Sequence, residues 1–563
     1  MTKKDIIRLL EDIAIYLELN LENGFRVSAY RKAAAALERD QRSFSEIESF
    51  SDIKGIGKGT REVIEEYIET GESSLLNELK EETPVGLTYM TKIPGLGAKR
   101  VAKIYETTGI STLDELEKFL RDGKLQKLPG FGKKTEENIL NGLLELNDVK
   151  RYPISTVIHI SETIEEFLNN LDYIETFDIA GSARRLAETS GDIDFIIKTD
   201  EAKQFIKDIE TAGFFKLFIA KGEKKTSIMY EEGLTKIQVD FRLVSGDEYY
   251  STLQHFTGSK EHNVRLRQIA KERNEKINEY GVERDGEIIT FKSETEFYNH
   301  FDLPFYPPAM RENGSEIDTD ISNIVTLDDI KGDIHMHTTY SDGAFNIREM
   351  VEACIERGYE YIVITDHSKN LSVANGLSDE RLMKQIEEIR KINNEYSEID
   401  VYAGTEMDIL ADGTLDYSDD ILKELDYVIA SIHSNFNQTT EEIMHRLKSA
   451  MENPYVRHIA HPTGRLIGRR EGYKVDIEAL LKLAKETNTI LEVNANPQRL
   501  DLSSDVIYGK DVMLTVNTDA HHIDHLEFMK YGIATLQKGL INKEQVLNTK
   551  TRKEFKQFIE DGK

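Results

Sequence analysis

The sequence feature that most restricts the fold of this 563-residue chain is a series of short apolar runs in its C-terminal part. They include residues 361–364, 427–430, 490–493 and 513–516, separated by stretches long enough for helices. Such runs predict buried parallel strands that alternate with helices in an α/β fold. In an α/β barrel the carboxyl ends of the strands converge on one rim. We therefore expect the side chains that follow these runs to meet at one site.

Histidines and carboxylates gather near the ends of the predicted strands. Ten of the 14 histidines lie between His335 and His525. Nine residues are candidate ligands: His335, His337, Asp342, His367, Glu406, His433, His461, Asp519 and His521. Six imidazoles and three carboxylates are too many for one ion, and this mixed nitrogen and oxygen set suits two or three Mn²⁺, Zn²⁺ or Fe ions. A single histidine is usually an ordinary polar residue, whereas nine ligands at successive strand ends predict a metal cluster.

Four other polar residues of this region fall outside the ligand pattern. We expect His458, His522 and His525 to support the ligands or to lie at the surface. Arg465, in Thr463-Gly464-Arg465, either steers a phosphate or caps a helix.

A second candidate site is predicted in the middle of the chain. Residues 191–197 and 236–244 have the period-two pattern of strands. The first strand places Asp192 and Asp194 on one face, and Asp240 lies on the polar face of the second. Three carboxylates on adjacent strands repel one another unless cations lie between them. They predict a two-cation site of the kind that phosphoryl transfer uses; the alternative is three solvated carboxylates at strand edges.

A short turn precedes these carboxylates. The predicted strand 175–180 leads into Gly181-Ser182, and Arg184 and Arg185 follow. Backbone N–H groups, a hydroxyl and guanidinium groups are the donors that a polyphosphate requires. We therefore expect a metal and a nucleotide to meet here.

Three copies of a glycine motif occur in the first 150 residues, which otherwise have helical patterns. Each has two glycines around an apolar residue and a basic helix pattern behind it, and the glycine pairs are Gly55 and Gly57, Gly95 and Gly97, and Gly130 and Gly132. The glycines allow a tight turn and leave N–H groups at the next helix N-terminus for a phosphate. The motif resembles the helix-hairpin-helix DNA-binding motif, which grips the backbone and reads no base sequence. The alternative is three ordinary connections between helices.

The charge distribution favours DNA binding only locally. A formal net charge of −30 argues against nucleic acid, because the field of such a protein repels a polyanion. Basic residues nevertheless surround each glycine motif: Lys54, Lys58 and Arg61; Lys92, Lys99, Arg100 and Lys103; and Lys124, Lys127, Lys133 and Lys134.

The central site and the segment after it resemble the palm and thumb of a family X DNA polymerase, similar to DNA polymerase beta. The resemblance rests on residues 181–197, on Val239-Asp240, and on residues 255–259 with 263–267. It implies that Asp192 and Asp194 bind two Mg²⁺ or Mn²⁺ ions and that Asp240 binds the catalytic one. It also implies contacts to the incoming deoxynucleoside triphosphate (dNTP) from Ser182, Arg185, Ser190, Gly191, His255, Phe256, Gly258, Asn263 and Arg267, the last two on the minor-groove side of the nascent pair.

Two positions depart from the beta-type pattern. His255-Phe256 stands where that pattern has Tyr-Phe, which bears on sugar discrimination. Val63 stands at the position of the Schiff-base lysine that removes deoxyribose phosphate, and because valine has no amine we expect no such lyase activity. Phe25, Arg26 and Tyr30 match positions that contact a downstream 5′-phosphate or a template base; the alternative is ordinary helix-surface and core residues.

The nine C-terminal ligands resemble those of the PHP domain, the polymerase and histidinol phosphatase superfamily, and match every position over residues 331–563. The resemblance implies a distorted (β/α)7 barrel and metal-dependent phosphoester hydrolysis. On a polymerase it implies a 3′-5′ exonuclease that acts on the primer end. Phosphatase or phosphodiesterase chemistry on damaged 3′ ends and cleavage at abasic sites remain open alternatives.

These parts predict a multidomain chain with an all-α helix-hairpin-helix region, an α/β nucleotidyltransferase palm with its thumb, and the barrel. The expected domains are an N-terminal DNA-binding domain at 1–80, a fingers-like domain at 81–150, the palm at 151–245, the thumb at 246–310, a polar connection at 311–330 and the PHP domain at 331–563.

The function expected from this organisation is template-directed DNA synthesis for short gap filling in base excision repair, coupled to 3′-end hydrolysis. The expected partners are gapped or primed DNA and dNTPs. Two alternatives remain, a metal-dependent phosphatase with a DNA-binding module and a template-independent nucleotidyltransferase.

Cysteine content and hydropathy restrict the compartment. Cys354 is the only cysteine, which excludes a disulfide framework and fits a reducing cytosol. No run of about 18 apolar residues occurs. We expect a monomer in the bacterial cytoplasm, with neither export nor membrane insertion.

Overall fold

The structure is a computed structural model that describes residues 3–40, 47, 49–91, 93, 95–147, 151–232 and 235–563. The chain divides into two compact units, described separately below. One contains Met1–Lys150, Thr338–Asn346 and Asp366–Leu382, and the other contains Arg151–His337, Ile347–Thr365 and Met383–Lys563. Within the described ranges, no helix has both the length and the apolar character needed to cross a bilayer.

The regular elements that the structure describes up to residue 147 are all helical, as predicted. They are α1 (Lys3–Leu19), α2 (Gly24–Arg39), η2 (Phe50–Asp52), α3 (Lys58–Thr70), α4 (Ser74–Glu82), α5 (Val85–Met90), α6 (Ala98–Thr108), α7 (Leu113–Arg121), η3 (Leu125–Lys127) and α8 (Lys133–Asn147). Local sequence sets several ends: the Asn23 side chain accepts the N–H of Phe25, and Thr112 and Glu115 form a capping box. Two apolar cores form, one around α1 to α4 and the other around α5 to α8.

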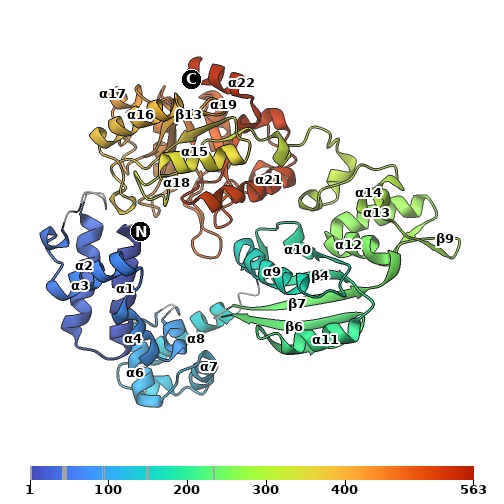
Figure 1. Ribbon diagram of the computed structural model, residues 1–563, viewed down its shortest axis with the longest axis horizontal. Helices are drawn as coiled ribbons and strands as arrows, with labels where there is room; N and C mark the ends of the chain where they lie inside the picture. The colour runs from blue at the N-terminus through green and yellow to red at the C-terminus, as the bar shows by residue number, and fades with distance from the viewer. Residues whose placement is uncertain are drawn as a thin grey trace. The chain divides into compact units, whose positions relative to one another are not determined.

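A five-stranded sheet forms the centre of residues 151–245, the first part of the second unit (Figure 1). Its order is β2-β4-β7-β6-β5, with β2 (Thr176–Ala180), β4 (Asp192–Lys198), β5 (Phe215–Ala220), β6 (Lys225–Glu232) and β7 (Thr235–Val244). The same region contains β1 (Tyr152–Pro153), β3 (Thr189–Ser190), α9 (Ile154–Asn169), α10 (Gly181–Arg184) and α11 (Ala202–Thr211). Strands β4 and β7 are adjacent and parallel, which brings together the two aspartate-bearing strands expected from the sequence.

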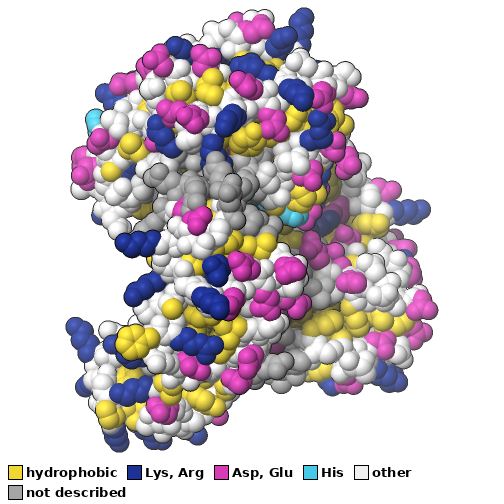
Figure 2. All heavy atoms as spheres, turned by 60° about the vertical axis from the view of Figure 1, so that its left-hand side comes forward, with side chains coloured by type: hydrophobic (Ala, Val, Ile, Leu, Met, Phe, Trp, Pro, Cys, Tyr) yellow, Lys and Arg dark blue, Asp and Glu magenta, His cyan; other side chains and the backbone are white. Residues whose placement is uncertain are grey.

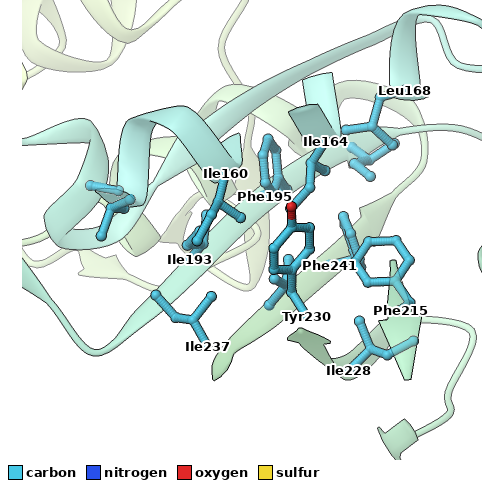
Figure 3. Packing of buried hydrophobic residues seen from close by; sticks show 14 of the residues in the cluster. Ile160, Ile164, Leu168, Ile193, Phe195, Phe215, Ile228, Tyr230, Ile237 and Phe241 are labelled. Atoms are coloured by element: carbon cyan, nitrogen blue, oxygen red, sulfur yellow. The ribbon is translucent and has the colours of Figure 1, made fainter. Parts of the chain in front are cut away.

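The two faces of this sheet have different partners. Ile193 and Phe195 of β4 and Phe241 of β7 belong to one apolar cluster with Ile160 and Ile164 of α9, as Figure 3 shows. The opposite face packs through Ile196 against α12 (Tyr249–Thr257). Alternation along the strands thus buries one face and turns the aspartates to the other, because successive side chains point to opposite sides.

The thumb region follows the sheet. Its elements are η4 (Gly246–Glu248), α12 (Tyr249–Thr257), α13 (Lys260–Glu272), β8 (Lys276–Ile277), β9 (Val282–Arg284), β10 (Glu287–Ile289), α14 (Glu294–Asn299), η5 (Pro308–Met310) and η6 (Ser315–Asp318). The predicted connection 311–330 is packed against this region in its first part. Arg311 is fully buried and pairs with Glu294, and Nδ1 of the buried His262 donates a 2.6 Å hydrogen bond to the Glu316 carboxylate.

The last part of the chain forms the predicted barrel. Seven parallel strands follow one another in sequence order, β11 (Gly332–Asp333), β12 (Tyr361–Ile364), β13 (Asp400–Asp408), β14 (Tyr427–Ser431), β15 (Val456–Ile459), β16 (Ile490–Asn494) and β17 (Leu514–Asn517). A parallel bridge between Met336 and Ala520 joins the first strand's end to the last. The barrel is therefore nearly closed, which confirms the predicted (β/α)7 fold class.

One short helix precedes the barrel strands, and other helices connect the strands or follow the last of them (Figure 1). They are η7 (Leu327–Asp329), α15 (Ile347–Glu356), η8 (Ser372–Ala374), α16 (Asp379–Asn393), α17 (Asp419–Leu422), α18 (Thr440–Glu452), α19 (Ile477–Glu486), α20 (Ser504–Ile507), η9 (Ile523–Phe528), α21 (Met529–Lys538), η10 (Lys543–Gln545), η11 (Leu547–Thr549) and α22 (Arg552–Glu560).

Candidate functional site

The three palm aspartates meet on one face of the sheet. In the parallel register of β4 and β7, Asp194 lies directly opposite Asp240, and Asp192 lies two residues earlier on β4. Asp192 is exposed, whereas Asp240 is buried. The site therefore has one open side and one enclosed side.

The protonation of these carboxyl groups reflects their crowding. Burial, and then the charges of Asp192 and Asp240, raise the pKa of Asp194 to about 7. Although Asp192 is exposed as a residue, partial desolvation of its carboxyl group, and then the charge of Asp240, also raise its pKa. Burial alone would raise the pKa of Asp240 as well, but hydrogen bonds from Lys225, Ser227 and Gln238 outweigh it and lower that pKa. A cation bound between the carboxylates would offset the mutual repulsion that contributes to the raised pKa values of Asp192 and Asp194.

Gly181 allows the turn to approach the aspartates closely. Its φ is +62°, and a Cβ placed on it would lie 2.7 Å from Oδ2 of Asp194. Beyond it, the hydroxyls of Ser182 and Ser190 are 2.5 Å apart, and Ser190 also donates to the carbonyl oxygen of Asp192. The turn and the metal-binding face are thus continuous.

The two arginines of the turn differ in their partners. Arg184 forms two hydrogen bonds with the carboxylate of Glu294 and one with Thr257, which ties it to the thumb. Arg185 donates to the carbonyl oxygen of Thr257 at 2.6 Å and lies 3.7 Å from Glu312. Arg184 therefore ties the turn to the thumb, a role that the sequence did not predict.

The residues expected around the nucleotide base lie at the junction of α12 and α13. His255 and Phe256 are half-buried, and the Arg242 guanidinium stacks 3.5 Å from the centre of the Phe256 ring. The buried Asn263 donates to the carbonyl oxygen of His255 and accepts from Gln254, so its amide is already engaged. Arg267 is exposed, and Gly258, with φ +68°, lies beside Arg185.

Four of the predicted barrel ligands converge in the barrel interior. Ligand atoms of His335, His337, Glu406 and Asp519 lie within 4.8 Å of one another, and all four residues are buried. Nε2 of His337 is 3.1 Å from Asp519 and 3.5 Å from Glu406. Such a set of two imidazoles and two carboxylates suits a divalent transition metal.

Three further predicted ligands contact this group. Nε2 of His433 and Nε2 of His461 lie 3.1 and 2.8 Å from the same Glu406 oxygen. The His521 ring stacks on the His337 ring at 4.2 Å and lies 3.7 Å from Asp519. Seven of the nine predicted ligands are therefore in one cluster of the second unit.

Asp342 and His367 belong to the other unit. There, Oδ1 of Asp342 is 3.5 Å from Nε2 of His367, and both side chains are buried. They are linked to the cluster by short chain segments, because Asp342 follows His337 by five residues and His367 follows β12 by three.

Two buried carboxylates that sequence reasoning missed orient the ligands. Glu492, on β16, accepts from Nδ1 of His335 at 2.7 Å and from the backbone N–H of His461 at 2.8 Å. Burial opposes its ionisation, but His335 and neighbouring histidines lower its pKa to about 2. Asp408 contacts Nδ1 of His433 at 2.6 Å. Glu492 left a signal in the sequence, a carboxylate inside an apolar run, because a charge in a buried strand needs a partner.

The cluster fits metal ions. Nε2 of His335 is buried and has no hydrogen-bond partner among the described residues, although Glu406 and Asp519 lie 3.4 and 3.5 Å away. Because Glu492 holds Nδ1, Nε2 is the nitrogen directed into the cluster. An imidazole nitrogen aimed between two carboxylates is the arrangement of a metal ligand with an orienting carboxylate behind it.

Each of the three glycine motifs forms the same turn. The first glycines, Gly55, Gly95 and Gly130, have φ values of +122°, +82° and +91°, and the second glycine of each pair directly precedes α3, α6 or α8. The apolar residue between the glycines donates its N–H to the carbonyl oxygen three residues earlier. The turns therefore share a backbone geometry that requires glycine.

Most of the basic residues around these turns are exposed. They include Lys54, Lys58, Lys99, Arg100, Lys124, Lys127, Lys133 and Lys134, whereas Lys92 lies outside the described residues. Nζ of Lys103 would lie 3.3 Å from a Cβ at Gly130, so the second and third motifs are neighbours. Dark blue Lys and Arg side chains line the lower left edge of Figure 2.

The other N-terminal candidates differ in accessibility. Phe25 is 87% exposed, and Arg26 is exposed and pairs with Glu22 at 3.4 Å. Tyr30 and Val63 belong to the core of α1 to α4. Tyr30 is therefore available to a ligand only if that core opens, whereas Phe25 is accessible.

Arg465 has a role that neither sequence alternative described. Its guanidinium forms two hydrogen bonds with Glu188, at 2.6 and 3.2 Å, and donates to the carbonyl oxygens of Arg499 and Leu500. His458 is fully buried 3.8 Å from Glu492, and Nδ1 of His525 accepts from the N–H of His521.

Sequence models of five known families match this chain. They are described as helix-hairpin-helix domain at residues 1–73, SAM-like helix-hairpin-helix tandem at 87–144, DNA polymerase beta palm at 151–263, DNA polymerase beta thumb at 252–312, and PHP domain at 333–496.

Curated relatives fall into two groups. The DNA polymerase/3′-5′ exonuclease PolX of Bacillus subtilis (strain 168) is 51% identical over 567 aligned residues, which cover 99% of each chain. A probable phosphatase of Caldanaerobacter subterraneus subsp. tengcongensis is 30% identical over 41% of this chain and 91% of its own length. A probable phosphatase of Thermoanaerobacter sp. (strain X514) is 28% identical over 41% of this chain and 95% of its own.

Proposed function

Because the chain belongs to the PolX family of DNA polymerases, we propose that it fills short gaps in DNA by template-directed synthesis and shortens 3′ ends with its PHP barrel. The setting is base excision repair in the cytoplasm, the substrates are gapped or primed DNA and dNTPs, and the enzyme acts as a monomer. The domain limits are those expected from the sequence: 1–80, 81–150, 151–245, 246–310, a connection at 311–330, and 331–563.

The observation that carries the polymerase assignment is the pairing of Asp194 with Asp240 on adjacent strands, beside the Gly181 turn. Asp192, Asp194 and Asp240 hold two Mg²⁺ or Mn²⁺ ions. Such ions, when bound, activate the primer hydroxyl and neutralise the charge of the triphosphate. Lys225, paired with Asp240 at 2.6 Å, keeps this carboxylate ionised and ready for a cation.

The chain's own donors position the nucleotide. Ser182, Ser190 and the backbone at Gly191 face the triphosphate, and Arg185 turns from the Thr257 carbonyl oxygen to join them when DNA and nucleotide bind. His255, Phe256, Gly258, Asn263 and Arg267 contact the sugar and base edge, with Asn263 exchanging its present partners.

The barrel is the hydrolytic site. We propose that the nine ligands predicted from the sequence hold two or three Mn²⁺, Zn²⁺ or Fe ions. Such ions supply a nucleophile at neutral pH and stabilise the leaving oxygen. Glu492 and Asp408 keep His335 and His433 in the orientation that ligation needs.

The helix-hairpin-helix turns hold the DNA by its phosphates. The glycine pairs at 55 and 57, 95 and 97, and 130 and 132 offer backbone N–H groups, and the exposed lysines nearby supply charge. Phe25 and Arg26 lie at the side that receives the downstream end of a gap, and the buried Tyr30 supports helix α2, which carries them. Val63 gives no amine for lyase chemistry.

A gapped primer-template separates the two activities. With Mg²⁺ or Mn²⁺, Asp192→Ala is expected to lose extension by about 100-fold or more while retaining 3′ shortening, and His335→Ala to do the opposite, because each removes a metal ligand from one site only. Primer length on a denaturing gel reports both activities. The matched controls are Asp200→Ala and His445→Ala, which change exposed residues of the same types.

Loss of both activities in either variant would contradict the two-site assignment. Extension that ignores the templating base would favour template-independent transfer. Release of phosphate from a 3′-phosphorylated primer without nucleotide removal would favour the phosphatase chemistry suggested by the barrel's other relatives.

A further inference from the structure

The barrel and the palm share one apolar core. Leu500 and Tyr531 of the barrel region are buried in the same cluster as the palm residues Ile193 and Phe241. Helix α21 packs on the barrel side against β16 and β17, and on the other side against η5 at the end of the thumb. The face of α21 away from the barrel is thus an internal surface of the second unit.

Lys538 ends α21 at the back of the nucleotide turn, the segment from Gly181 to Gly191. Its side chain is only 8% exposed. Nζ donates a 2.5 Å hydrogen bond to the carbonyl oxygen of Leu186 and lies 3.8 Å from Oε1 of Glu312. Glu312 lies 3.7 Å from Arg185, so the ammonium, this carboxylate and the guanidinium form a chain.

A second contact from the barrel reaches the same turn. Arg465 pairs with Glu188 through two hydrogen bonds, and two backbone carbonyl oxygens of the barrel fix the arginine itself. Leu186 and Glu188 therefore have partners in the barrel, and they lie between Arg185 on one side and Ser190 and Gly191 on the other.

One residue of the turn, Leu186, has a left-handed backbone conformation. Leu186 has φ +50°, a conformation that is unfavourable for a leucine and that needs surrounding contacts to persist. The carbonyl oxygen of Leu186 accepts a hydrogen bond from the buried ammonium of Lys538. Once both groups are desolvated, this charged donor binds the oxygen more strongly than water does.

We propose that Lys538 and Arg465 of the PHP barrel are positioning residues for nucleotide incorporation in the palm, because they hold the turn that carries Ser182, Arg185, Ser190 and Gly191. This inference rests on the proposed polymerase function and deepens it. The barrel then has a role in DNA synthesis that does not depend on its own hydrolytic activity.

The charge of Lys538 makes the contact sensitive to pH. Burial lowers the pKa of Lys538 to about 8, although Glu312 and Glu188 oppose this effect and Arg185 adds to it. The ammonium is charged at pH 7 and loses its proton as the pH rises past 8. The hold on the turn weakens in the same direction.

The test compares Lys538→Met, Lys538→Arg and Glu188→Gln with the wild type in single-nucleotide gap filling. Lys538→Met is expected to raise the KM for dNTP about tenfold with little change in kcat, since one charge-assisted hydrogen bond is lost. Lys538→Arg restores most of the affinity, and Glu188→Gln raises KM about threefold. Lys530→Met, an exposed lysine of the same helix, is the matched control and leaves KM unchanged.

Three outcomes decide the matter. Between pH 7 and 9 the wild-type KM rises towards that of Lys538→Met, whereas Lys538→Arg does not follow. An unchanged KM in both Lys538→Met and Glu188→Gln, with an active wild type, would overturn the inference. If the wild type itself extends no primer, the proposed function fails instead. Where Lys538→Met does not fold, as judged by its unfolding midpoint, Glu188→Gln and the pH profile carry the test.

Discussion

Gly181 controls the geometry of the palm site most directly, because it has no side chain. It has a left-handed backbone, and the missing Cβ leaves room for the Asp194 carboxylate. Any larger residue would both strain the backbone and displace the Asp194 carboxylate. Gly181 thus links the nucleotide turn to the metal-binding face.

Gly181→Ala is therefore expected to lower the rate of extension about 100-fold, because a metal ligand moved by roughly 1 Å loses its productive geometry. Pre-steady-state incorporation of one nucleotide measures this loss, and 3′ shortening serves as the internal reference. Gly213→Ala is the matched control, since a Cβ there meets no atom within 4 Å. A Gly181→Ala enzyme with wild-type extension would show that the turn does not constrain Asp194.

The sequence could predict that the aspartates share one face and that barrel candidates come together, but not their partners. Period two placed Asp192, Asp194 and Asp240 on one face because strand geometry is local. Lys225 and Arg184 could not be assigned in the same way. Their roles depend on contacts with Asp240 and with Glu294, which is 110 residues distant from Arg184. Tyr30 was a candidate contact, yet the packing of α1 to α4 buries it.

At the scale of elements, the hairpin helices show how an acidic protein can bind DNA. The lysines and arginines gather at the turns before α3, α6 and α8, so attraction acts over distances shorter than the Debye length of about 10 Å, where the net charge of −30 matters less. In the proposed DNA complex, the backbone N–H groups at each turn add phosphate contacts that do not depend on side-chain charge.

The double variant Lys99→Ala/Lys103→Ala tests the α6 turn. Its affinity for gapped duplex is expected to fall, and the slope of log K against log salt concentration to decrease by about 2, because each phosphate contact contributes about 0.9. Fluorescence anisotropy at several salt concentrations measures both. Lys118→Ala/Arg121→Ala on α7 removes the same charge from exposed positions away from a glycine turn and is expected to leave the slope nearly unchanged. Equal slopes for the two double variants would indicate general charge attraction alone.

Elements with strong local patterns were predicted well. The sheet strands at 192–198 and 235–244 and the barrel strands at 361–364 and 427–431 fall within one or two residues of the expected runs. Residues 311–330, which include Arg311 and Glu316, were expected to be a polar connection, because the segment is polar and acidic without clear periodicity. Both are buried through ion pairs with Glu294 and His262, which no periodicity in the segment could reveal.

At the scale of the whole molecule, the two catalytic folds are not independent of each other. The palm core contains Leu500 and Tyr531, and Phe528 and Ile467 pack against it from the barrel region. Shared apolar burial couples the stabilities of the parts that share it, because neither core is complete alone. The palm and barrel should then unfold as one cooperative unit.

This coupling can be measured because the chain has no tryptophan. Phe218→Trp, on palm strand β5, adds a single fluorescent reporter. In that background Leu447→Ala removes a fully buried side chain from α18 of the barrel and should lower the free energy of unfolding by about 2–5 kcal/mol. If the palm and barrel unfold together, the palm tryptophan reports this whole loss as a lower urea midpoint.

Leu120→Ala, a similarly buried change in α7 of the other unit, is expected to leave that midpoint in place. If Leu447→Ala leaves the urea midpoint of the palm tryptophan unchanged, the shared core is too weak to couple the two folds. The effect of Lys538 on the nucleotide turn would then be purely local.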